Sequence, residues 1–583
     1  MIINMQWIKR LFKKENFWPL LIVVSFALLA GRSLIFESGY FNMHDDLQMM
    51  RQLEMEKCFL DGQIPCRWVP DMGYGYGFPL FNFYPPLPYL VGEVFRIMQF
   101  SFVDTAKLTF ALSFVLSGIT MYFLSKEFFG KWGGVISAVF YIWAPYHSVD
   151  IYVRGAMNES WGFVWFPLIL WTSYRLIIER KRVSSWLIGL ALSWAGLLLS
   201  HNVMVMIFTP VFAVWVFGFW IQDRNWKKFF QLFSSGVLAL GLSSFFTLPA
   251  IFEQKYVHVD SLVQGYYEYI AHFASIGQLL TARYWGYGAS IWGPNDGMPF
   301  QIGQLHWVLS IVVILFLLIS RVKKNKFPNY SLYTILFSLS VGWFAAFMAH
   351  QNSTFIWQHI KPLAFVQFPW RFLTLAVFGL SFSLGSLSIL LKPFDKVRIV
   401  APSLLIILLV IINWNYFLPQ GGKMGSLTDE QKFSGVAWNM QKTAGIFDYL
   451  PLTAVRNPKD PPNGLAEVVT GKGVVVSSDQ GTNWATFDIN LSTDSVIRIN
   501  LFQFPNWKVV VDGNTDDVYI PKTEDYGRMY INIPKGNHSV SLNLENTPIR
   551  SFSNIISLIT WVSLFGYTLL KKKNENRRIL SNL

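Results

Sequence analysis

The sequence has little charge and almost no cysteine. Of its 583 residues only 14% are charged and two are cysteine, whereas 52% are hydrophobic. Soluble domains carry about 25% charged residues, so most of this chain is adapted to a medium other than water. Two cysteines also supply too few soft ligands for a zinc site.

Several catalytic signatures are absent as well. The chain has no P-loop, which leaves ATP-driven chemistry unsupported. It has no Gly-x-Ser-x-Gly elbow and no His-Glu-x-x-His pattern. These absences count against a serine hydrolase and against a zinc protease.

Long apolar runs recur along the chain. Each has the length that crosses a hydrocarbon core about 30 Å thick. The expected membrane spans, about twelve in number, lie near residues 17–36, 105–125, 132–146, 159–178, 184–200, 203–221, 229–250, 304–320, 331–349, 370–391, 399–417 and 553–570. The chain is therefore predicted to be a polytopic α-helical membrane protein.

Basic residues concentrate in alternate connections between these runs. The segments concerned are 1–16, 126–131, 175–182, 223–228, 321–326, 392–398 and 571–583. They hold 25 Lys and Arg against 6 Asp and Glu, while the rest of the chain holds 23 against 29. Cytoplasmic loops are rich in Lys and Arg, so both termini are predicted to be cytoplasmic in the cell membrane. The same distribution explains the net charge of +13 without nucleic acid as a partner.

The N-terminal stretch has the basic start and apolar core of a signal peptide. However, the apolar run resumes after Arg32 with "SLIF", and many spans follow. We therefore expect an uncleaved membrane anchor.

Three regions follow one another along the chain. Residues 1–417 form a predicted helical membrane domain with two long external loops, 37–104 and 251–303. Residues 418–552 are polar and, by the parity of the spans, extracytoplasmic. Residues 553–583 supply a last span and a basic cytoplasmic tail.

The polar region alternates between apolar and polar residues in "SVIRINLFQF", "WKVVVDGN" and "RMYINIPKGNHSVSLNLE". Such alternation, interrupted by Asp-Gly turns, predicts an antiparallel β-sandwich. The domain would be a structural cap or a module that binds carbohydrate or positions an acceptor. Trp484 and Trp507 fit the second role if they are exposed and a hydrophobic core if they are buried.

The first external loop is aromatic and rich in Gly and Pro. Its last apolar stretch, 87–100, carries Glu93 and Arg96 and is short for a span, so an interfacial or re-entrant helix is expected. Both cysteines, Cys58 and Cys66, lie in this loop. In an oxidising exterior they either form a disulfide or stay as thiols, and the sequence leaves both open.

Ionisable residues gather at the external ends of the spans. The stretch "MHDDLQMM" places His44, Asp45 and Asp46 just beyond the first span. The other candidates on the same side are Arg154, Glu159, His201, Arg283, His306 and Arg371. Carboxylates there could act as bases or bind a divalent cation, and arginines could hold a phosphate. Taken singly, each arginine could equally be an interface anchor, but a phosphorylated lipid substrate needs the combination.

The stretch "DGQIPCRWVPDMGYGYGFPLFNFYPPLPYL", which follows the acidic motif, resembles the membrane family called 6-pyruvoyl-tetrahydropterin-synthase-related. "RGAMNESW", "SHN" and "QFPWRFL" are similar to later motifs of that family, and the C-terminal region resembles the β-domain of YfhO-like proteins. The family is placed in the GT-C glycosyltransferase superfamily. The sequence has no zinc-binding histidine set of the pterin synthase kind, so no pterin chemistry is assigned.

The resemblance implies an integral membrane glycosyltransferase of GT-C type. Such enzymes take a sugar from a polyprenyl-phosphate carrier and pass it to a glycan or lipid acceptor outside the membrane. An acidic residue of the first external loop acts as base or metal ligand, and by position that role falls on Asp45 or Asp46, with Mg or Mn as the candidate cation. A single displacement needs no covalent intermediate, so the anomeric configuration is expected to invert. The remaining candidates are Glu159 for catalysis, Arg154, Arg283 and Arg371 for the phosphate, and His44, His201 and His306 for the cavity.

Two other functions stay open. A glycolipid transporter or flippase would share the arginines and aromatic residues, but transporters usually place polar sites at the bilayer midplane and show repeated halves. Here the ionisable residues gather at one surface, and no repeat is evident. A non-catalytic envelope scaffold would use its β-domain to bind glycan, and Asp45→Asn and Asp46→Asn variants separate it from a transferase.

Overall fold

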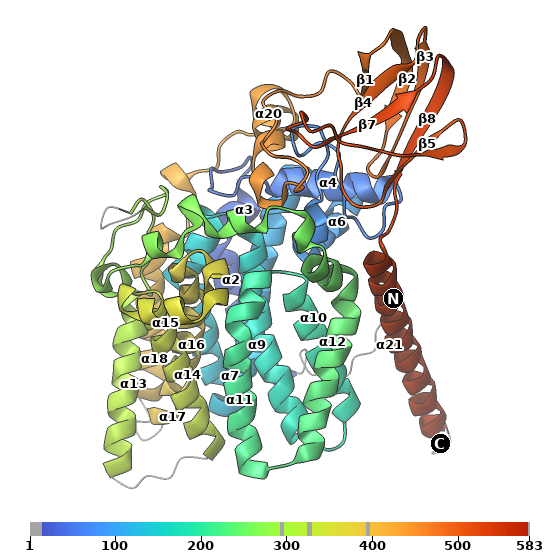
Figure 1. Ribbon diagram of the computed structural model, residues 1–583. Helices are drawn as coiled ribbons and strands as arrows, with labels where there is room; N and C mark the ends of the chain where they lie inside the picture. Colours follow the sequence, from blue (N-terminus) through green and yellow to red (C-terminus); the bar gives the residue numbers. More distant parts are fainter. Residues whose placement is uncertain (1–13, 292–295, 323–328, 392–396, 581–583) are drawn as a thin grey trace.

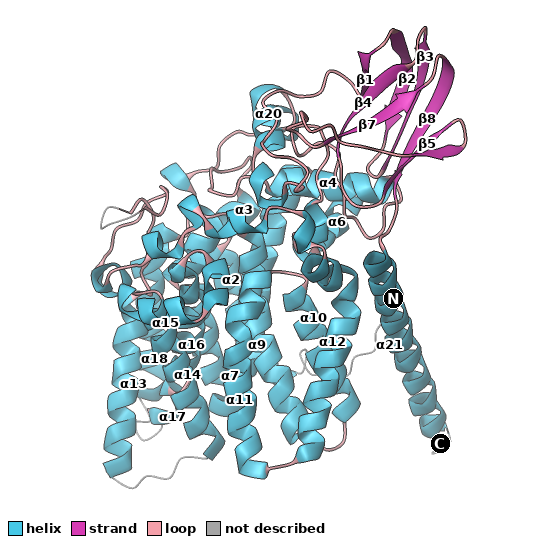
Figure 2. Cartoon of the chain, in the orientation of Figure 1, coloured by secondary structure: helices cyan, strands magenta, loops and turns pink. Residues whose placement is uncertain are grey.

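The computed structural model of the chain describes residues 14–291, 296–322, 329–391 and 397–580. Several predicted cytoplasmic segments, at both termini and near 323–326 and 392–396, fall partly or wholly outside the described residues. Helices form the main body, and β-strands from the C-terminal part gather at one end of it (Figures 1 and 2). The chain is therefore a mostly helical protein with a C-terminal β-sheet region.

Among the described residues, seven helices are long and apolar enough to cross a membrane, judged by length and composition. They are Phe102–Ile142 (α7), Met157–Ile178 (α9), Asn202–Gln222 in α11 (Asn202–Asp223), Trp226–Tyr256 around α12 (Trp226–Phe252), Tyr330–Met348 in α14 (Asn329–Met348), Pro369–Leu390 (including α16, Leu373–Leu384, and α17, Leu387–Leu390) and Pro548–Lys572 in α21 (Pro548–Leu580).

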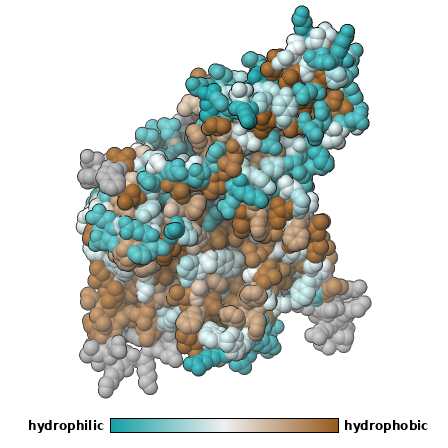
Figure 3. Space-filling model, in the orientation of Figure 1, coloured by the Kyte–Doolittle hydropathy of each residue, from teal (hydrophilic) through white to brown (hydrophobic). Residues whose placement is uncertain are grey.

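Shorter apolar helices accompany them: α2 (Lys14–Ala30), α10 (Val183–Leu198), α13 (Gln304–Val322) and α18 (Val397–Asn413). On the face that Figure 3 draws, hydrophobic side chains form a belt across the helical body, with a more hydrophilic surface above it. The chain is thus an integral membrane protein, while the number of spans stays a prediction.

The element α7 is a helical hairpin and not one long rod. Its backbone leaves the helical region at Gly130, where φ is 74° and ψ is −179°, a conformation that favours glycine. Beyond this turn, Ser137 Oγ lies 2.7 Å from Ser125 Oγ, and a side chain added at Gly118 would meet Ile142. Residues so far apart cannot touch in a straight helix, which advances about 1.5 Å per residue, so the chain turns back on itself.

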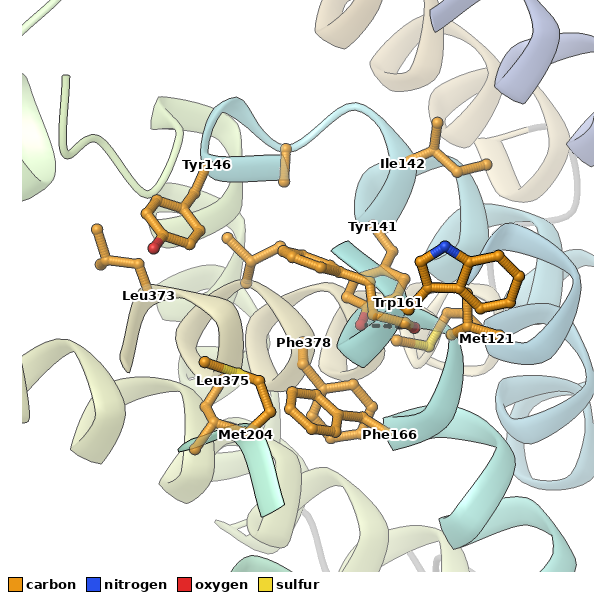
Figure 4. Packing of buried hydrophobic residues seen from close by; sticks show 14 of the residues in the cluster. Met121, Tyr141, Ile142, Tyr146, Trp161, Phe166, Met204, Leu373, Leu375 and Phe378 are labelled. Carbon is orange, nitrogen blue, oxygen red and sulfur yellow. Dashed lines mark hydrogen bonds between the residues drawn. The ribbon is translucent and has the colours of Figure 1, made fainter. Parts of the chain in front are cut away.

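The helices are held together by close packing. Lipid tails are as apolar as leucine, so contact between helices gains little from removal of water and depends on fit. Between α14 and α16 the backbones approach closely, because a side chain added at Gly379 would meet Gly342 N at 2.5 Å. Figure 4 shows Phe166 of α9 beside Phe378 of α16, with ring centroids 6.2 Å apart.

The first external loop folds into short helices: α3 (Arg32–Phe36), α4 (Gln48–Leu60), α5 (Leu80–Phe83) and α6 (Leu87–Ile97). A disulfide joins Cys58 at the end of α4 to Cys66. Helix α6 covers most of the apolar stretch for which an interfacial helix is predicted.

Eight strands follow near the C-terminus: β1 (Ala466–Thr470), β2 (Gly473–Gln480), β3 (Trp484–Leu491), β4 (Ser495–Phe502), β5 (Trp507–Val511), β6 (Asn514–Asp516), β7 (Arg528–Ile533) and β8 (Gly536–Leu544). They form an antiparallel three-stranded sheet, β1-β4-β7, and an antiparallel five-stranded sheet, β2-β3-β8-β5-β6. Buried side chains of both sheets belong to one hydrophobic cluster. Between β5 and β6, Asp512 and Gly513 both have positive φ (50° and 86°), as a two-residue hairpin turn requires.

The two tryptophans of the strands are engaged inside the protein. Trp507 is buried with its ring centroid 5.6 Å from that of Trp68, and the Trp484 indole N–H donates to Asp61 at 2.9 Å. Trp507 is thus a packing residue between the strands and the first loop, and the half-buried Trp484 is attached to that loop through Asp61.

A buried polar network joins the β-sheet region to the helical body. Glu253, at the end of α12, accepts hydrogen bonds from Arg550 Nε (2.9 Å) and Thr547 Oγ1 (2.5 Å) at the start of α21. It also accepts one from Asn82 of the first loop at 2.8 Å, and Arg67 bonds Asn82 in turn at 3.2 Å. Because Glu253 and Arg550 are both 1% exposed, the joint depends on every partner being present.

The remaining short elements lie mostly at the same end as the strands. They are α8 (Pro145–Ser148), η1 (Val149–Val153), η2 (Gln254–Tyr256), η3 (Val259–Val263), η4 (Gly265–Tyr267), η5 (Tyr269–His272), η6 (Gly277–Thr281), η7 (Gln351–Ser353), α15 (Thr354–His359), η8 (Lys361–Val366), η9 (Pro369–Phe372), η10 (Trp414–Tyr416), η11 (Gln420–Gly422), α19 (Asp429–Lys432), α20 (Gly435–Thr443) and η12 (Ile446–Tyr449).

Candidate functional site

A cavity of about 850 Å³ lies where the ends of several helices meet the short elements. Its walls come from the stretch before α4, the loop after η1, the first turns of α9 and α11, the end of α12, and the α19–η12 segment. Four carboxylates line it: Asp45, Asp46, Glu159 and Asp448. Four cations line it too: Arg51, Arg154, Arg371 and Lys432.

Backbone hydrogen bonds hold the acidic motif against the loop that carries Arg154. The backbone N–H of His44 donates to Val153 O at 3.1 Å, and that of Asp45 donates to Arg154 O at 2.9 Å. The next residue, Gly155, has φ +62°, and a side chain there would collide with Met43. Glycine at this position therefore lets the two chain segments lie side by side.

Asp45 is paired within its own stretch of chain. Arg51 Nη1 lies 2.7 Å from Asp45 Oδ2, and Gln48 Nε2 donates to the same oxygen at 3.1 Å. Arg51 is held in turn over the ring of Tyr84, 4.3 Å from its centroid. This carboxylate is thus fixed in place by groups of α4 and the first loop.

Asp46 is paired with a residue from the other end of the chain. Lys432 Nζ lies 2.6 Å from Asp46 Oδ2. Although the Asp46 side chain is partly exposed, its Oδ1 is buried and hydrogen-bonds to none of the described residues. Desolvation raises the pKa of Asp46 despite the opposing effect of Lys432.

Glu159 sits in the first turn of α9 and is fully buried. Arg154 Nη1 lies 2.8 Å from its Oε2 and Arg371 Nε lies 3.3 Å from the same oxygen. Tyr146 and Thr374 donate hydroxyl hydrogens to Oε1 at 3.2 and 3.3 Å. The carboxylate therefore holds the two arginines side by side at the cavity wall.

Both arginines keep a free edge toward the cavity. Arg154 Nη2 and Arg371 Nη2 hydrogen-bond to none of the described residues, and neither atom is fully buried. Aromatic rings support them, with Arg154 4.6 Å above the centroid of Trp370 and Arg371 5.0 Å above that of Phe368. Stacked guanidinium groups with unused N–H donors are suited to binding an anion.

The protonation state of Asp150 sets the net charge of the cluster that it forms with Arg154, Glu159 and Arg371. Asp150 accepts a hydrogen bond from Arg154 and is fully buried. Burial, with the Glu159 carboxylate nearby, raises the pKa of Asp150 well above its usual range. When Asp150 is protonated, Glu159 is the one anion facing Arg154 and Arg371, and the group has a net positive charge.

The two cavity histidines are neutral. His201 is the N-cap of α11, where its Nδ1 accepts a hydrogen bond from the backbone N–H of Met204 at 3.3 Å. Burial lowers the pKa of His201 to about 3, so the neutral ring has its proton on Nε2. His44 Nε2 lies 3.1 Å from Tyr287 O, and desolvation lowers the pKa of His44 too.

Two residues expected at the site lie elsewhere. Arg283 is exposed on the loop after η6 and does not line the cavity. His306 is fully buried at the start of α13, with Nε2 2.9 Å from Phe140 O and its ring against that of Phe140. The fold turns Arg283 to the surface and His306 into the core.

The described residues also offer a poor set of ligands for a divalent cation. They contain no group of three or more His, Cys, Asp or Glu side chains able to hold a metal ion. The two aspartates proposed as ligands, Asp45 and Asp46, are paired with Arg51 and Lys432. A cation would have to displace an arginine and a lysine, so the arrangement does not fit the metal and no chemical step is derived through it.

Three charged residues of the cavity escape sequence-based reasoning. Arg51 lies on α4, six positions after Asp45, and in the sequence it resembles any exposed charge on a helix. Its closeness to the acidic motif in the sequence is the one signal that could have identified it. Lys432 and Asp448 lie in the polar segment before the strands, about 390 and 400 residues from Asp45 and Asp46. Nothing local in that segment indicates that it reaches the cavity.

No family model matches the chain. An uncharacterized protein of Lactococcus lactis subsp. cremoris (strain MG1363) is 25% identical over 341 residues, which cover 56% of this chain and 53% of that protein. The match thus spans about half the length of that relative.

Solved structures with similar arrangements include forms of the oligosaccharyltransferase of Archaeoglobus fulgidus. The apo form has a TM-score of 0.44 at 13% identity, covering 78% of this chain and 62% of that chain. The form tethered with an acceptor peptide containing the NVT sequon has a TM-score of 0.43 at 14% identity, covering 78% and 61%. A complex of AglB with an inhibitory peptide and a dolichol-phosphate has a TM-score of 0.39 at 15% identity, covering 77% and 61%. Likeness at this level carries no weight for the activity of this chain.

Proposed function

We propose that this protein is a GT-C-type glycosyltransferase that moves a sugar from a polyprenyl-phosphate carrier to a hydroxyl-bearing glycan or lipid outside the membrane. The observation that carries the proposal is the pair of stacked arginines, Arg154 and Arg371, with free Nη2 donors in a cavity that carboxylates and aromatic rings also line. This combination suits a substrate with a phosphate, a sugar and a neutral nucleophile.

The phosphate of the carrier binds the free edges of Arg154 and Arg371. As the bond between the sugar and the phosphate breaks, negative charge grows on the leaving phosphate, and prearranged guanidinium groups stabilise it. Glu159 is a positioning residue in this scheme, because its two oxygens hold both arginines and two hydroxyl groups. Because Glu159 is fully buried and forms ion pairs with both arginines, it holds them in place and does not transfer the proton in this scheme.

The sugar lies against the aromatic part of the cavity. Tyr266, Tyr267, Phe368 and Trp370 line this part, and the rings of Phe368 and Trp370 stack with centroids 4.7 Å apart. Aromatic faces pack against the C–H groups of a sugar ring while its hydroxyl groups reach polar partners. The carrier's apolar chain would continue into the hydrophobic belt.

The transfer is a single displacement at the anomeric carbon. The acceptor oxygen forms a bond to that carbon while the carbon–oxygen bond to the phosphate breaks and its electron pair leaves with the phosphate. A carboxylate of the cavity takes the hydroxyl proton, and Asp45 or Asp46 of the first loop is the candidate that the family resemblance offers. One displacement inverts the anomeric configuration.

The test is transfer of labelled sugar by the purified full-length chain from a panel of polyprenyl-phosphate hexoses, with native lipid extract as acceptor. Arg371→Gln and Arg154→Gln are expected to lower kcat/KM by about 100-fold or more, as removal of a donor to the developing charge does. Arg283→Gln is the matched control, since this arginine lies outside the cavity, and it should leave transfer unchanged.

Two results would count against the proposal. If Arg283→Gln and Arg371→Gln lowered kcat/KM equally, the loss would come from the change in surface charge and not from the cavity. If folded wild-type protein transferred sugar from no donor of the panel, a glycolipid transporter or an envelope scaffold would be the better explanation.

A further inference from the structure

Asp448 differs from the other three carboxylates of the cavity. Asp45, Asp46 and Glu159 each form an ion pair with a cation of the cavity. The Asp448 side chain forms no ion pair and no hydrogen bond with any described residue, although its carboxylate lines the same space. The side chain is half-buried and faces the cavity with no direct cation partner, so its carboxylate is available to a bound substrate.

The segment that carries Asp448 is firmly held. The ring of Tyr449 stacks on Phe83 of α5 with centroids 5.4 Å apart. The backbone N–H of His258 donates to Leu450 O at 3.0 Å, and Ser261 Oγ donates to Phe447 O at 3.1 Å. These contacts tie η12 to the first and second external loops, so the carboxylate keeps a fixed place in the wall.

We propose that Asp448 is the catalytic base that binds and deprotonates the acceptor hydroxyl, while Asp45 and Asp46 position the groups around it. This inference rests on the proposed function. The carboxylate takes the proton from the acceptor O–H, the acceptor oxygen bonds to the anomeric carbon, and the electron pair of the broken bond leaves with the phosphate. The proton then passes from Asp448 to bulk water or to the released phosphate, which restores the carboxylate.

The charges around Asp448 suit this role. Arg51 favours the ionised carboxylate and Asp45 opposes it, while Tyr267 and Tyr449 are the titratable neighbours on η4 and η12. Desolvation is the largest effect and raises the pKa of Asp448 to about 6. A general base works best when its pKa lies near the working pH, and this carboxylate is ionised yet basic at neutral pH.

The wall beside Asp448 indicates the kind of acceptor. Ala437, Met440, Ala444 and Gly445, on and just after α20, line this side of the cavity. These four residues carry no charge, and Arg51 and Lys432, which line the same cavity, are already paired with Asp45 and Asp46. A neutral hydroxyl of a sugar or a lipid therefore fits here better than a charged nucleophile.

A first experiment tests whether Asp448 is the free carboxylate, independently of any transfer. The full-length chain in detergent is treated with N,N′-dicyclohexylcarbodiimide at pH 6, and modified peptides are quantified by mass spectrometry. This apolar reagent attacks protonated, unpaired carboxyl groups, so Asp448 should be modified at least about tenfold faster than Asp45 or Asp46. Equal modification of the three, or none at Asp448, would overturn the inference.

A second experiment tests the catalytic role in the transfer assay. Asp448→Asn should lower kcat by about 100-fold or more with a change in donor KM of less than about threefold, and Asp448→Glu should restore part of the rate. The rise of kcat/KM near pH 6 should be absent in Asp448→Asn, a result that a structural role alone does not produce. Transfer within about threefold of wild type in Asp448→Asn would refute the base role and leave the proposed function standing. Absence of transfer in wild type would instead refute the proposed function, with the labelling result still deciding whether Asp448 is free.

Discussion

The ammonium group of Lys432 lies 2.6 Å from the carboxylate of Asp46, a residue 386 positions earlier in the chain. The same ammonium donates to the backbone oxygen of Asp46 at 3.3 Å. Through this pair the polar segment before the strands is attached to the acidic motif of the first external loop. The cavity is therefore built from segments that lie far apart in the sequence.

Replacing Lys432 with methionine should loosen that attachment. A hydrogen bond between charged groups contributes about 1.5–3 kcal/mol, and the partial exposure of Asp46 favours the lower end of this range. Backbone amides of residues 428–449 should then exchange with deuterium about tenfold faster, as hydrogen-exchange mass spectrometry can measure. Lys442→Met is the matched control, because Lys442 lies on the same segment and forms no ion pair in the described structure. Similar exchange in both variants would mean that the pair does not hold the segment.

The joint between the sheets and the helices should fail when Glu253 is changed to glutamine. Its carboxylate accepts from Arg550, Thr547 and Asn82, and a buried ion pair that loses one charge costs about 3–5 kcal/mol. The apparent melting temperature in detergent should fall, and trypsin should cut earlier after Arg550 at the start of α21. Glu268→Gln, at an exposed glutamate of the next loop, should change neither measurement. Intact stability in Glu253→Gln would show that the network is not what joins the two parts.

Stability should depend on pH through Asp448. Its pKa is raised to about 6 from an ordinary value of 3.8, so the folded protein binds the proton more tightly than the unfolded chain. This acid therefore favours folding below about pH 4, and the benefit is lost as the pH rises to about 6. We expect Asp448→Asn to melt at a higher temperature than wild type at pH 7.5, with the difference shrinking toward pH 4.5. An equal shift at both pH values would contradict the raised pKa.

The disulfide should stabilise the first loop. Cys58 and Cys66 close a loop with a sequence separation of 8, for which the chain-entropy estimate is about 2–3 kcal/mol. The Cys58→Ser/Cys66→Ser double variant should lower the apparent melting temperature, and dithiothreitol should lower that of wild type by a similar amount. The reductant should have no effect on the double variant, which serves as its control. If dithiothreitol lowered the melting temperature of the double variant as much as that of wild type, the effect of the reductant would not come from this disulfide.

Chelation should have little effect on transfer. Asp45 and Asp46 are occupied by Arg51 and Lys432, so in the proposed mechanism the arginine donors stabilise the leaving phosphate. Activity in EDTA should stay within about twofold of the activity with added Mn²⁺, measured in the same labelled-sugar assay. Loss in EDTA with recovery on Mn²⁺ would mean that substrate binding separates these ion pairs and creates a metal site.

Local patterns in the sequence predicted many of the helices and several of the strands. Apolar runs of membrane length correspond to helices, because a chain in lipid must satisfy its backbone internally. Alternation in the stretch that contains Trp507 corresponds to β5, because one face of each sheet is buried. Strand β2 gave no such signal, since nearly all of its residues are exposed.

The acidic motif, Glu159, Arg154 and Arg371 could be named in advance, because charged residues beside apolar runs are few and stand out. Their partners could not. Lys432 and Asp448 reach the cavity by contacts between segments hundreds of residues apart, and such contacts depend on how the helices pack and on how the strands attach through Glu253. The same packing removed Arg283 and His306 from the site. Secondary structure follows from short-range periodicity, whereas the make-up of the cavity is decided by long-range packing that no local pattern encodes.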